Sequence, residues 1–463
     1  MKDKTAQQSV GYFTDWLRFR YEREDIPGFV VAISRSGKLL FNEPYGYADL
    51  EKKEKMTTDH IFRIASHSKT FTATAIMQLQ ERGKLRIDNY VVDYVPWLKS
   101  HKDKRFLKIT IRQLLSHSAG IIRDGLDSNY WELEKEFPNL EQFKEEILEA
   151  KLVIDNNTKM KYSNYGYSLL GQIVEAVSTK SYNVYVTENI IKPLRLANTG
   201  PELSPRIVDR LVTGYTRADY KKKRLPIAQI DTKIMSPATG FYSNTEDLCQ
   251  YFTAQMIGSG KLLDDESKKE MQRIQWRAEN TGHEEIYYGL GLEIEIVGEQ
   301  RLLGHGGGFP GHITMSLFDP KEKTVVIILT NAMGSPTEYI NKSIFKTLGY
   351  FQEKWKQASG KDLSKYQGRF MGLWNVMDFI SLGNKLVAVS SNTWDPFDEP
   401  EELEHVKDNS FKIIKTSSFG SGGELIHFNF NKSGKVESVI YAGEKILPEI
   451  TYIKEFSKKK KIG

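Results

Sequence analysis

The chain has 463 residues, well above the roughly 150 expected for one domain, so two domains are predicted rather than a single small module. Hydrophobic residues are 40% and charged residues 27%, an ordinary globular composition that excludes a collagenous or disordered chain. The net charge is +5, and four positive charges form the terminal run Lys458–Lys461, which we expect to be solvated. Nucleic acid and anionic membranes need clustered basic charge rather than a small global excess, so neither is expected as a partner.

Cys249 is the only cysteine, so an intramolecular disulfide is excluded. It lies in an apolar helical stretch, where we expect a buried structural thiol rather than a nucleophile. The N-terminal residues show no apolar core of a signal peptide, and the longest aliphatic run, Val325–Leu329, is far shorter than the roughly 20 residues of a membrane helix. We therefore expect a cytoplasmic protein, unless a leader peptide has been removed.

The first elements in chain order are an N-terminal helix and a hairpin, formed by Phe29–Ile33 and Lys38–Phe41. A second hairpin with many β-branched residues is predicted late in the sequence, at Gly311–Phe318 and Thr324–Thr330. Helical periodicity and loops dominate the region between them. This order predicts an α/β (α+β) fold, with one antiparallel sheet completed by distant segments, flanked by helices and joined by a helical subdomain.

The pattern changes near residue 355, where a polar stretch indicates a linker and the helices disappear. The recurring short strands that follow predict a small antiparallel β-barrel or sandwich. The expected organisation is a larger domain at 1–355, a linker at 356–364 and a barrel at 365–463. The strand candidates are Lys385–Val389, Phe411–Lys415, Leu425–Phe430 and Val436–Tyr441.

The first chemical motif pairs Ser66 with Lys69, directly before apolar positions at helical spacing. Ser66 is expected to begin a buried helix, with Lys69 projecting from the same face. Burial lowers the pKa of a lysine, so its amine can take the serine proton and leave a nucleophilic alkoxide. Only Ser66 has this loop-to-buried-helix setting. The same S-x-x-K spacing recurs at Ser343/Lys346, in a predicted helix, and at Ser457/Lys460, in the basic tail.

A second motif, Tyr162-Ser163-Asn164, enters a helix with apolar residues at four-residue spacing. A tyrosine beside a lysine ammonium can be held as a phenolate and act as general base, and an asparagine amide supplies both a donor and an acceptor. The same Y-x-N spacing recurs at Tyr242/Asn244, interpreted as a strand end with a helix cap, and at Tyr339/Asn341, interpreted as a helix start.

The third motif, His305-Gly306-Gly307-Gly308, contains the only H-x-G of the chain and comes directly before a predicted strand. Glycines let the backbone approach a substrate closely, and a backbone N–H here can join that of Ser66 in stabilising an oxyanion. The alternative is a phosphate-binding loop. The segment lacks both the lysine and helix of a P-loop and the spacing of a dinucleotide fingerprint.

In this order the three motifs resemble those of the serine β-lactamase and penicillin-binding protein superfamily, and the Y-x-N form points to its class C β-lactamase-like branch. The resemblance covers roughly residues 10–350. Further matching segments are Thr110–Gly120, Pro193–Leu196 and Gly240–Leu248.

The resemblance implies a role for each matching residue. Ser66 becomes the acylated nucleophile, Lys69 its proton partner, and Tyr162 the base that also protonates the leaving group. Asn164 would orient Lys69 and the substrate amide. The N–H groups of Ser66 and Gly308 would form the oxyanion hole.

His305 and Gly307 would contact the substrate, and His305 stands where the family often has the lysine of K-T-G. A histidine is only partly protonated near neutrality, so it supplies less positive charge for a substrate carboxylate. This departure disfavours efficient β-lactam hydrolysis and favours the D-aminopeptidase, D-amino-acid amidase and esterase members of the family.

The sequence thus predicts a serine hydrolase that cleaves a small amide or short peptide through an acyl-enzyme. A carboxylesterase or weak β-lactamase using the same site stays open, as does a penicillin-binding sensor without turnover. The barrel resembles the accessory domain of some peptidase-like members, or would bind a partner of its own. Whether copies assemble into a homo-oligomer is left open.

The remaining histidines carry no metal-ligand spacing, so neither a metal nor a cofactor is expected. His67 and His117 are expected to be hydrogen-bonded structural residues. His312 opens the predicted strand beside the glycine segment, and alternation alone does not decide which side it faces.

Overall fold

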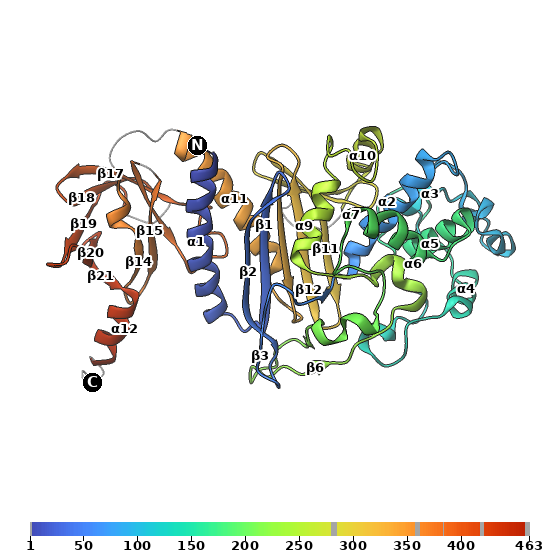
Figure 1. Ribbon diagram of the computed structural model, residues 1–463, viewed down its shortest axis with the longest axis horizontal. Coiled ribbons are helices and arrows are strands. Elements are labelled where there is room, and N and C mark those ends of the chain that lie inside the picture. The colour runs from blue at the N-terminus through green and yellow to red at the C-terminus, as the bar shows by residue number, and fades with distance from the viewer. Residues whose placement is uncertain (1, 279–284, 357–361, 383, 417–420, 459–463) are drawn as a thin grey trace. The chain divides into compact units, whose positions relative to one another are not determined.

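The computed structural model describes residues 2–278, 285–356, 362–382, 384–416 and 421–458. The chain divides into two compact units, one formed by Glu24–Asn341 and the other by Met1–Arg23 together with Lys342–Gly463. Helix α1 (Lys2–Arg23) therefore groups with the C-terminal residues (Figure 1). The predicted linker at 356–364 falls mostly on residues 357–361, outside the described ranges.

The larger unit is built on an antiparallel sheet that contains both predicted hairpins (Figure 1). The two hairpins meet where β1 pairs with β13, with Phe29 opposite Thr330. Every residue of β13 is buried, as its run of valine and isoleucine predicts for a central strand. Among the described residues, nine strands follow one another in the order β3 (Glu54–Lys55), β2 (Lys38–Asp49), β1 (Gly28–Arg35), β13 (Thr324–Thr330), β12 (His312–Asp319), β11 (Gln300–Phe309), β10 (Glu293–Val297), β9 (Glu285–Tyr288) and β8 (Trp276–Arg277).

Helices pack beside this sheet around one apolar core. Helices α2 (Ser68–Glu81), α5 (Asn164–Ser178) and α8 (Ser236–Thr239) contact one another, and α9 (Thr245–Ala254) packs on β13 and β1. Phe71 of α2 stacks on Tyr251 of α9, with ring centroids 3.8 Å apart. The predicted sheet, flanking helices and helical subdomain are thus confirmed. The other helices of this part are α3 (Ile111–Leu115), α4 (Leu140–Glu149), α6 (Tyr182–Val186), α7 (Lys192–Leu194) and α10 (Asp265–Gln272).

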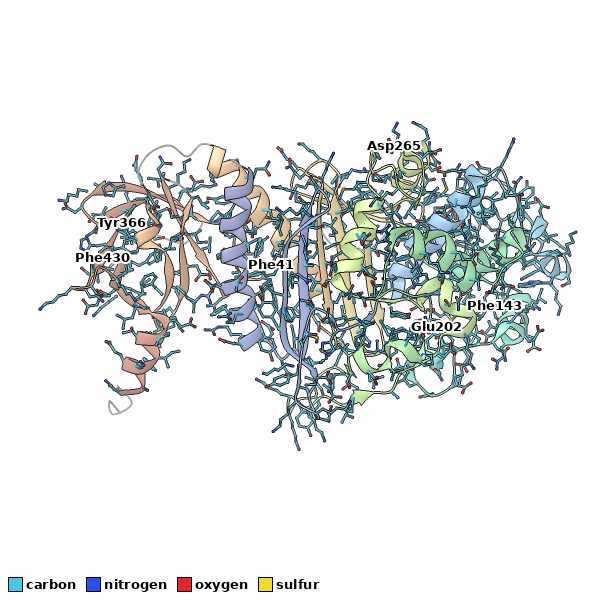
Figure 2. The ribbon with its side chains drawn as sticks, in the orientation of Figure 1. Phe41, Phe143, Glu202, Asp265, Tyr366 and Phe430 are labelled. Carbon is cyan, nitrogen blue, oxygen red and sulfur yellow. The ribbon has the colours of Figure 1, made fainter. Side chains whose placement is uncertain are left out.

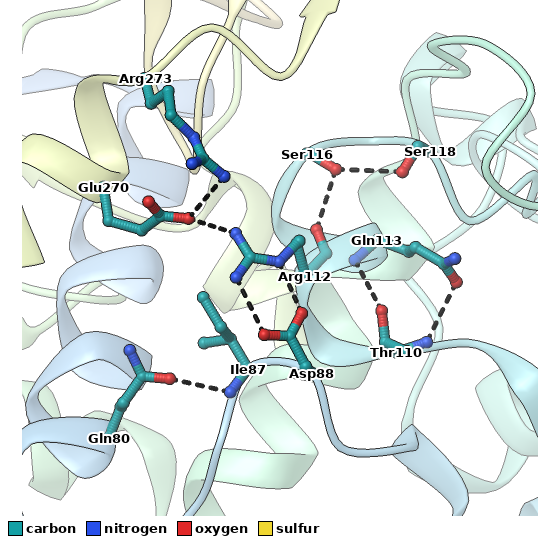
Figure 3. Close-up of polar contacts among 10 residues, drawn as sticks. All are labelled: Gln80, Ile87, Asp88, Thr110, Arg112, Gln113, Ser116, Ser118, Glu270 and Arg273. Carbon is teal, nitrogen blue, oxygen red and sulfur yellow. Dashed lines mark hydrogen bonds and ion pairs between the residues drawn. The ribbon is translucent and has the colours of Figure 1, made fainter.

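An ionic network centred on Arg112 anchors α3 (Figure 3). Arg112 of α3 donates to Asp88 at 2.6 Å and also pairs with Glu270 of α10. Because Arg112 connects three segments that are distant in sequence, it fixes the position of the following turn beside the sheet.

The smaller unit carries a closed antiparallel barrel, which confirms the predicted fold of this region. Aromatic rings fill its interior. Tyr366 packs against Phe428 at 4.9 Å and against Phe430 at 5.6 Å between ring centroids (Figure 2). The predicted strands are β16 (Lys385–Ser390), β18 (Ser410–Lys415), β19 (Leu425–Phe430) and β20 (Val436–Tyr441). The strands that the sequence did not indicate are β14 (Gly368–Met371), β15 (Val376–Leu382), β17 (Glu401–Lys407) and β21 (Glu444–Pro448).

Two local expectations require correction. The C-terminal region is not free of helix, because α12 (Glu449–Lys458) follows the last barrel strand. Its final residue, Lys458, opens the basic run, whose other residues lie outside the described ranges. The His305–Gly308 segment is not a loop before a strand, since it lies inside β11. None of the described helices has both the length and the apolar character needed to cross a membrane.

Candidate active site

Ser66 lies in a short 3-10 turn, Ala65–His67, that leads directly into α2. The preceding residue, Ala65, has φ +49°, in the left-handed region that residues with a side chain rarely adopt. Ser66 is half-buried and lines a cleft of about 970 Å³, whereas its neighbours in sequence are buried. The turn therefore presents the Ser66 hydroxyl to the cleft at the start of a buried helix, as predicted.

Lys69 lies in the first turn of α2, with its Nζ 3.0 Å from Ser66 Oγ. The same Nζ donates to the backbone carbonyl of Ala238 at 2.8 Å. The side chain is 0% exposed, and this burial holds the pKa of Lys69 well below its ordinary value. A lowered pKa favours the neutral amine, whose lone pair can accept a proton, so Lys69 is suited to take the serine proton.

Tyr162 precedes α5, whose first turn is capped by the Ser163 hydroxyl. The Tyr162 hydroxyl donates to Ser66 Oγ at 2.9 Å. Burial raises the pKa of Tyr162 well above its ordinary value, so the phenol keeps its proton. This differs from the expected phenolate because burial of the Tyr162 hydroxyl disfavours its charged form. Tyr162 is arranged as a proton donor.

Asn164 is the first residue of α5 and lines the cleft. Its Nδ2 donates to Asp124 Oδ1 at 2.6 Å. Because a carboxylate only accepts, this bond fixes the orientation of the amide. Asn164 Oδ1 has no hydrogen-bond partner among the described residues, although the residue is only 4% exposed. The expected contact of Asn164 with Lys69 is therefore replaced by that of Ala238.

His305 is buried on β11 with both ring nitrogens engaged. Nδ1 lies 2.6 Å from the carbonyl oxygen of Gly306 and must carry the proton, because that oxygen only accepts. Nε2 then accepts from the Tyr288 hydroxyl at 3.0 Å. Burial lowers the pKa of His305 to about 3. The expectation of a partly protonated residue is thus wrong, and His305 is neutral.

The glycines of β11 have two different roles. Gly308 is exposed and lines the cleft with Ser66, in a position that suits an oxyanion donor. At Gly307 a Cβ atom would lie 2.5 Å from the Ile64 carbonyl oxygen and 3.0 Å from His67 Nδ1. Gly307 therefore lets β11 pack closely against the turn that carries the nucleophile.

Three further histidines, His67, His117 and His312, are buried in the protein interior. His67 Nε2 lies 2.7 Å from Ser316 Oγ and its Nδ1 lies 2.8 Å from the Ile64 carbonyl, which fits the structural role expected. His117 Nδ1 accepts the Ser163 N–H at 3.2 Å, and its ring lies tilted against the Tyr162 ring with centroids 4.1 Å apart, which also fits a structural role. His312 is buried, and burial lowers its pKa to about 3.

The sequence did not single out several charged residues of the cleft. Arg123 pairs with Asp124 at 3.0 Å, and Arg217 lines the same cleft. Glu293, at the start of β10, accepts the Gly306 N–H at 2.8 Å. The alternation of Glu and Ile in β10 marks one face of the strand as polar, but only the fold brings that face to Ser66.

Neither a reactive thiol nor a metal centre accompanies these residues. Burial raises the pKa of Cys249 to about 12, so this thiol is inert, as expected. In the part of the chain that the structure describes, no group of three or more His, Cys, Asp or Glu side chains is placed to hold a metal ion.

The sequence of the chain matches a known family model and a known relative. A family model described as Beta-lactamase matches residues 13–349. Protein flp of Staphylococcus aureus (strain NCTC 8325 / PS 47) is 26% identical over 335 residues, which cover 70% of this chain but only 62% of flp.

Two solved structures share the fold. The octameric penicillin-binding protein homologue from Pyrococcus abyssi has a TM-score of 0.66 at 22% identity, covering 95% of this chain and 99% of that one. A D-stereospecific amidohydrolase from Streptomyces sp. has a TM-score of 0.58 at 22% identity, covering 72% of this chain and 94% of that one.

Proposed function

The chain belongs to the Beta-lactamase family, and from that membership we propose that it is a serine hydrolase that cleaves a small amide or short peptide through an acyl-enzyme on Ser66. One observation carries this proposal. Lys69 Nζ and the Tyr162 hydroxyl both lie within hydrogen-bond distance of Ser66 Oγ, at 3.0 and 2.9 Å, on the wall of an open cleft. This geometry supplies a nucleophile, a base and an acid at one atom.

Acylation begins when Ser66 Oγ attacks the substrate carbonyl carbon and its proton passes to the neutral Lys69 amine. The carbonyl π electrons move onto oxygen, and the backbone N–H groups of Ser66 and Gly308 stabilise the resulting oxyanion. When this intermediate collapses, the C–N bond breaks and the leaving nitrogen takes the Tyr162 proton. The Lys69 ammonium then returns its proton to the Tyr162 phenolate, so both side chains regain their starting protonation.

Water next attacks the acyl carbon, its proton passes back to the Lys69 amine, and the C–Oγ bond breaks. The carboxylic acid leaves and Ser66 recovers its hydroxyl proton. A carboxylesterase would use the same steps with an alcohol as the leaving group. The likeness to a D-stereospecific amidohydrolase and the neutral His305 support the amidase, D-aminopeptidase or penicillin-binding-protein-like peptidase type over a β-lactamase.

The test is the intact mass of the protein after exposure to a fluorophosphonate, with Ser66→Ala as the control. We expect one adduct on the natural chain, located at Ser66 by peptide mapping, and none on the variant. A folded protein without this adduct overturns the proposal. Kinetics on D-alanyl amides, D-peptides, nitrocefin and short nitrophenyl esters then identify the substrate class, whereas a persistent adduct without any turnover would indicate a sensor.

We also propose that copies of the chain form a homo-oligomer. The support is the likeness along 95% of this chain to the Pyrococcus abyssi protein, which is described as octameric. Analytical ultracentrifugation at micromolar concentration is expected to show a species larger than the 53.2 kDa monomer. A monomer alone at these concentrations contradicts the proposal.

A further inference from the structure

His117 binds the chain on both sides of Tyr162. Its backbone carbonyl accepts the Lys161 N–H at 2.6 Å, and its Nδ1 accepts the Ser163 N–H at 3.2 Å. Its ring lies against the Tyr162 ring, with centroids 4.1 Å apart and planes inclined by 35°. These three contacts of a single residue hold both the backbone around Tyr162 and its ring.

The position of the Tyr162 hydroxyl matters because it is the proton donor of the site. The hydroxyl lies at the far end of the ring and donates to Ser66 Oγ at 2.9 Å. A proton donor raises the rate only while it stays within hydrogen-bond reach of the reacting atoms, and a displacement of about 1 Å can cost about a hundredfold. A residue that holds the ring therefore acts on the chemistry without touching the substrate.

His117 is itself held in a turn that follows α3. Its φ is +57°, in the left-handed region that residues with a side chain rarely adopt. The hydroxyls of Ser116 and Ser118, on either side of it, bond to each other at 3.0 Å (Figure 3). A strained conformation of this kind persists only where the surrounding structure determines it, and such strain is concentrated at functional sites.

A second buried histidine, His101, makes the same kinds of contact away from the cleft. Its Nδ1 accepts the Asp103 N–H at 3.0 Å, and its ring stacks on Phe106 with centroids 3.7 Å apart. Its Nε2 lies 2.8 Å from the Ile147 carbonyl oxygen, to which it donates. Both nitrogens of His101 are therefore satisfied, as expected for a histidine that only stabilises the fold.

His117 differs from His101 at Nε2. Because the Ser163 N–H can only donate, His117 Nδ1 is unprotonated and Nε2 carries the ring proton. Nε2 has no hydrogen-bond partner among the residues that the structure describes, although His117 is only 1% exposed. A buried donor without a partner costs stability, and an apolar ring would fill the same space without that cost. The imidazole differs from such a ring in the acceptor that it offers to Ser163.

We propose that His117 is a positioning residue that holds the Tyr162 hydroxyl against Ser66, where it can protonate the leaving group. This inference rests on the proposed function and assigns no proton transfer to His117, which acts through Tyr162 alone. Its effect should therefore depend on the substrate. An amide nitrogen needs the Tyr162 proton in order to leave, whereas nitrophenolate leaves without one.

Two substitutions separate the contacts of His117. His117→Asn retains a side-chain acceptor and a residue type that tolerates a left-handed φ, but it removes the ring. His117→Phe retains a ring and removes the acceptor. His101→Asn is the matched control, because His101 combines the same two contacts and does not line the cleft.

The experiment compares two reactions of each variant. One is hydrolysis of the amide that the panel of D-alanyl amides and D-peptides identifies as the best substrate, and the other is hydrolysis of 4-nitrophenyl acetate. The His117 variants are measured both alone and combined with Tyr162→Phe. Fluorophosphonate labelling of Ser66 shows that the site of each variant is folded, and where one His117 variant does not label, the other decides.

We expect each His117 variant to lower kcat on the amide by about 10- to 100-fold, and to change kcat on the ester by less than about threefold. Combined with Tyr162→Phe, the same substitutions should cause less than about threefold further loss on the amide, because the hydroxyl that they position is already absent. His101→Asn should change the ratio of amide to ester kcat by less than about twofold.

Three results would overturn the inference: equal losses on amide and ester, an unchanged kcat on the amide in the labelled variants, or a full additional loss in the Tyr162→Phe background. Absence of labelling at Ser66 in the natural chain, or absence of turnover of any amide, would instead overturn the proposed function itself.

Discussion

Two serine–lysine pairs with the same S-x-x-K spacing occupy different environments in this chain. Ser66 and Lys69 lie at the start of α2, and Ser343 and Lys346 lie inside α11 (Thr337–Lys356). Lys69 is 0% exposed, and burial lowers its pKa. The Lys346 side chain is 37% exposed, and its pairing with Asp395 helps to raise its pKa.

The serines differ in the same way. Ser343 donates its hydroxyl hydrogen to the backbone carbonyl of Trp394, so this hydrogen is not directed toward a base. Ser66 Oγ instead lies between the buried Lys69 amine and the hydroxyl of Tyr162, which donates to it. The comparison teaches that S-x-x-K spacing supports chemistry only where burial keeps the lysine neutral and the serine faces a cleft.

The most severe test of this difference is removal of each hydroxyl. Ser66→Ala should lower kcat by about 10⁶-fold on the best substrate and abolish fluorophosphonate labelling. Ser343→Ala should leave kcat and the extent of fluorophosphonate labelling within about twofold of the natural chain, because the Ser343 hydroxyl only donates to a backbone carbonyl. Intact mass and initial rates measure both variants. Labelling of Ser343 would contradict the assignment of the nucleophile.

Removal of each amine should give the next largest contrast. Lys69→Met should lower kcat/KM by about 10³- to 10⁴-fold, because it removes the proton acceptor while retaining the length of the side chain. Lys346→Met should change kcat/KM less than twofold and cost at most about 1 kcal/mol of stability, as expected for a partly exposed ion pair. A comparable loss of activity in both variants would mean that burial is not what distinguishes the lysines.

Tyr162→Phe should lower kcat/KM by about 10² to 10³ on an amide, because the leaving nitrogen loses its proton donor. The effect on a nitrophenyl ester should be much smaller, since nitrophenolate leaves without a proton. Tyr339→Phe is the control, because Tyr339 shares the Y-x-N spacing but is 60% exposed. Equal losses on amide and ester substrates would argue against Tyr162 as the acid.

The pH dependence of kcat/KM reports the protonation of Lys69 directly. Only the neutral amine accepts the serine proton, so activity should fall about tenfold per pH unit as pH drops below the pKa of Lys69. Because burial lowers that pKa, the midpoint should lie well below the value near 10.4 of an ordinary lysine. Lys346→Met should retain the profile, and a midpoint near the ordinary value would contradict the buried neutral base.

The smallest expected effect is on stability, and it concerns a buried histidine that does not contact the catalytic residues. His312 is buried, with its pKa lowered from 6.5 to about 3. As pH falls from 6.5 toward 3, His312 binds a proton in the unfolded chain but not in the folded chain, so the free energy of unfolding decreases. His312→Gln should reduce the slope of unfolding free energy against pH by up to about 1.4 kcal/mol per unit, measured by urea titrations. An unchanged slope would contradict this assignment.

The sequence alone determined the features that depend on local pattern. Residue pattern predicted the two hairpins that contain β1 and β13, and regular short strands predicted the barrel. Ser66, Lys69 and Tyr162 were found because each stands in a motif at the start of a helix, and the structure brings all three together. Spacing along a helix and alternation along a strand are short-range properties that side-chain chemistry encodes directly.

Tertiary structure decided the charges of the site. The sequence predicted a phenolate at Tyr162 and a partly charged His305, but burial keeps the first protonated and the second neutral. It gave no sign that Glu293 would lie beside Gly306, or that Asn164 would bond Asp124. These features depend on which segments, distant in sequence, pack against a side chain. Desolvation changes the pKa of that side chain only after the segments have buried it.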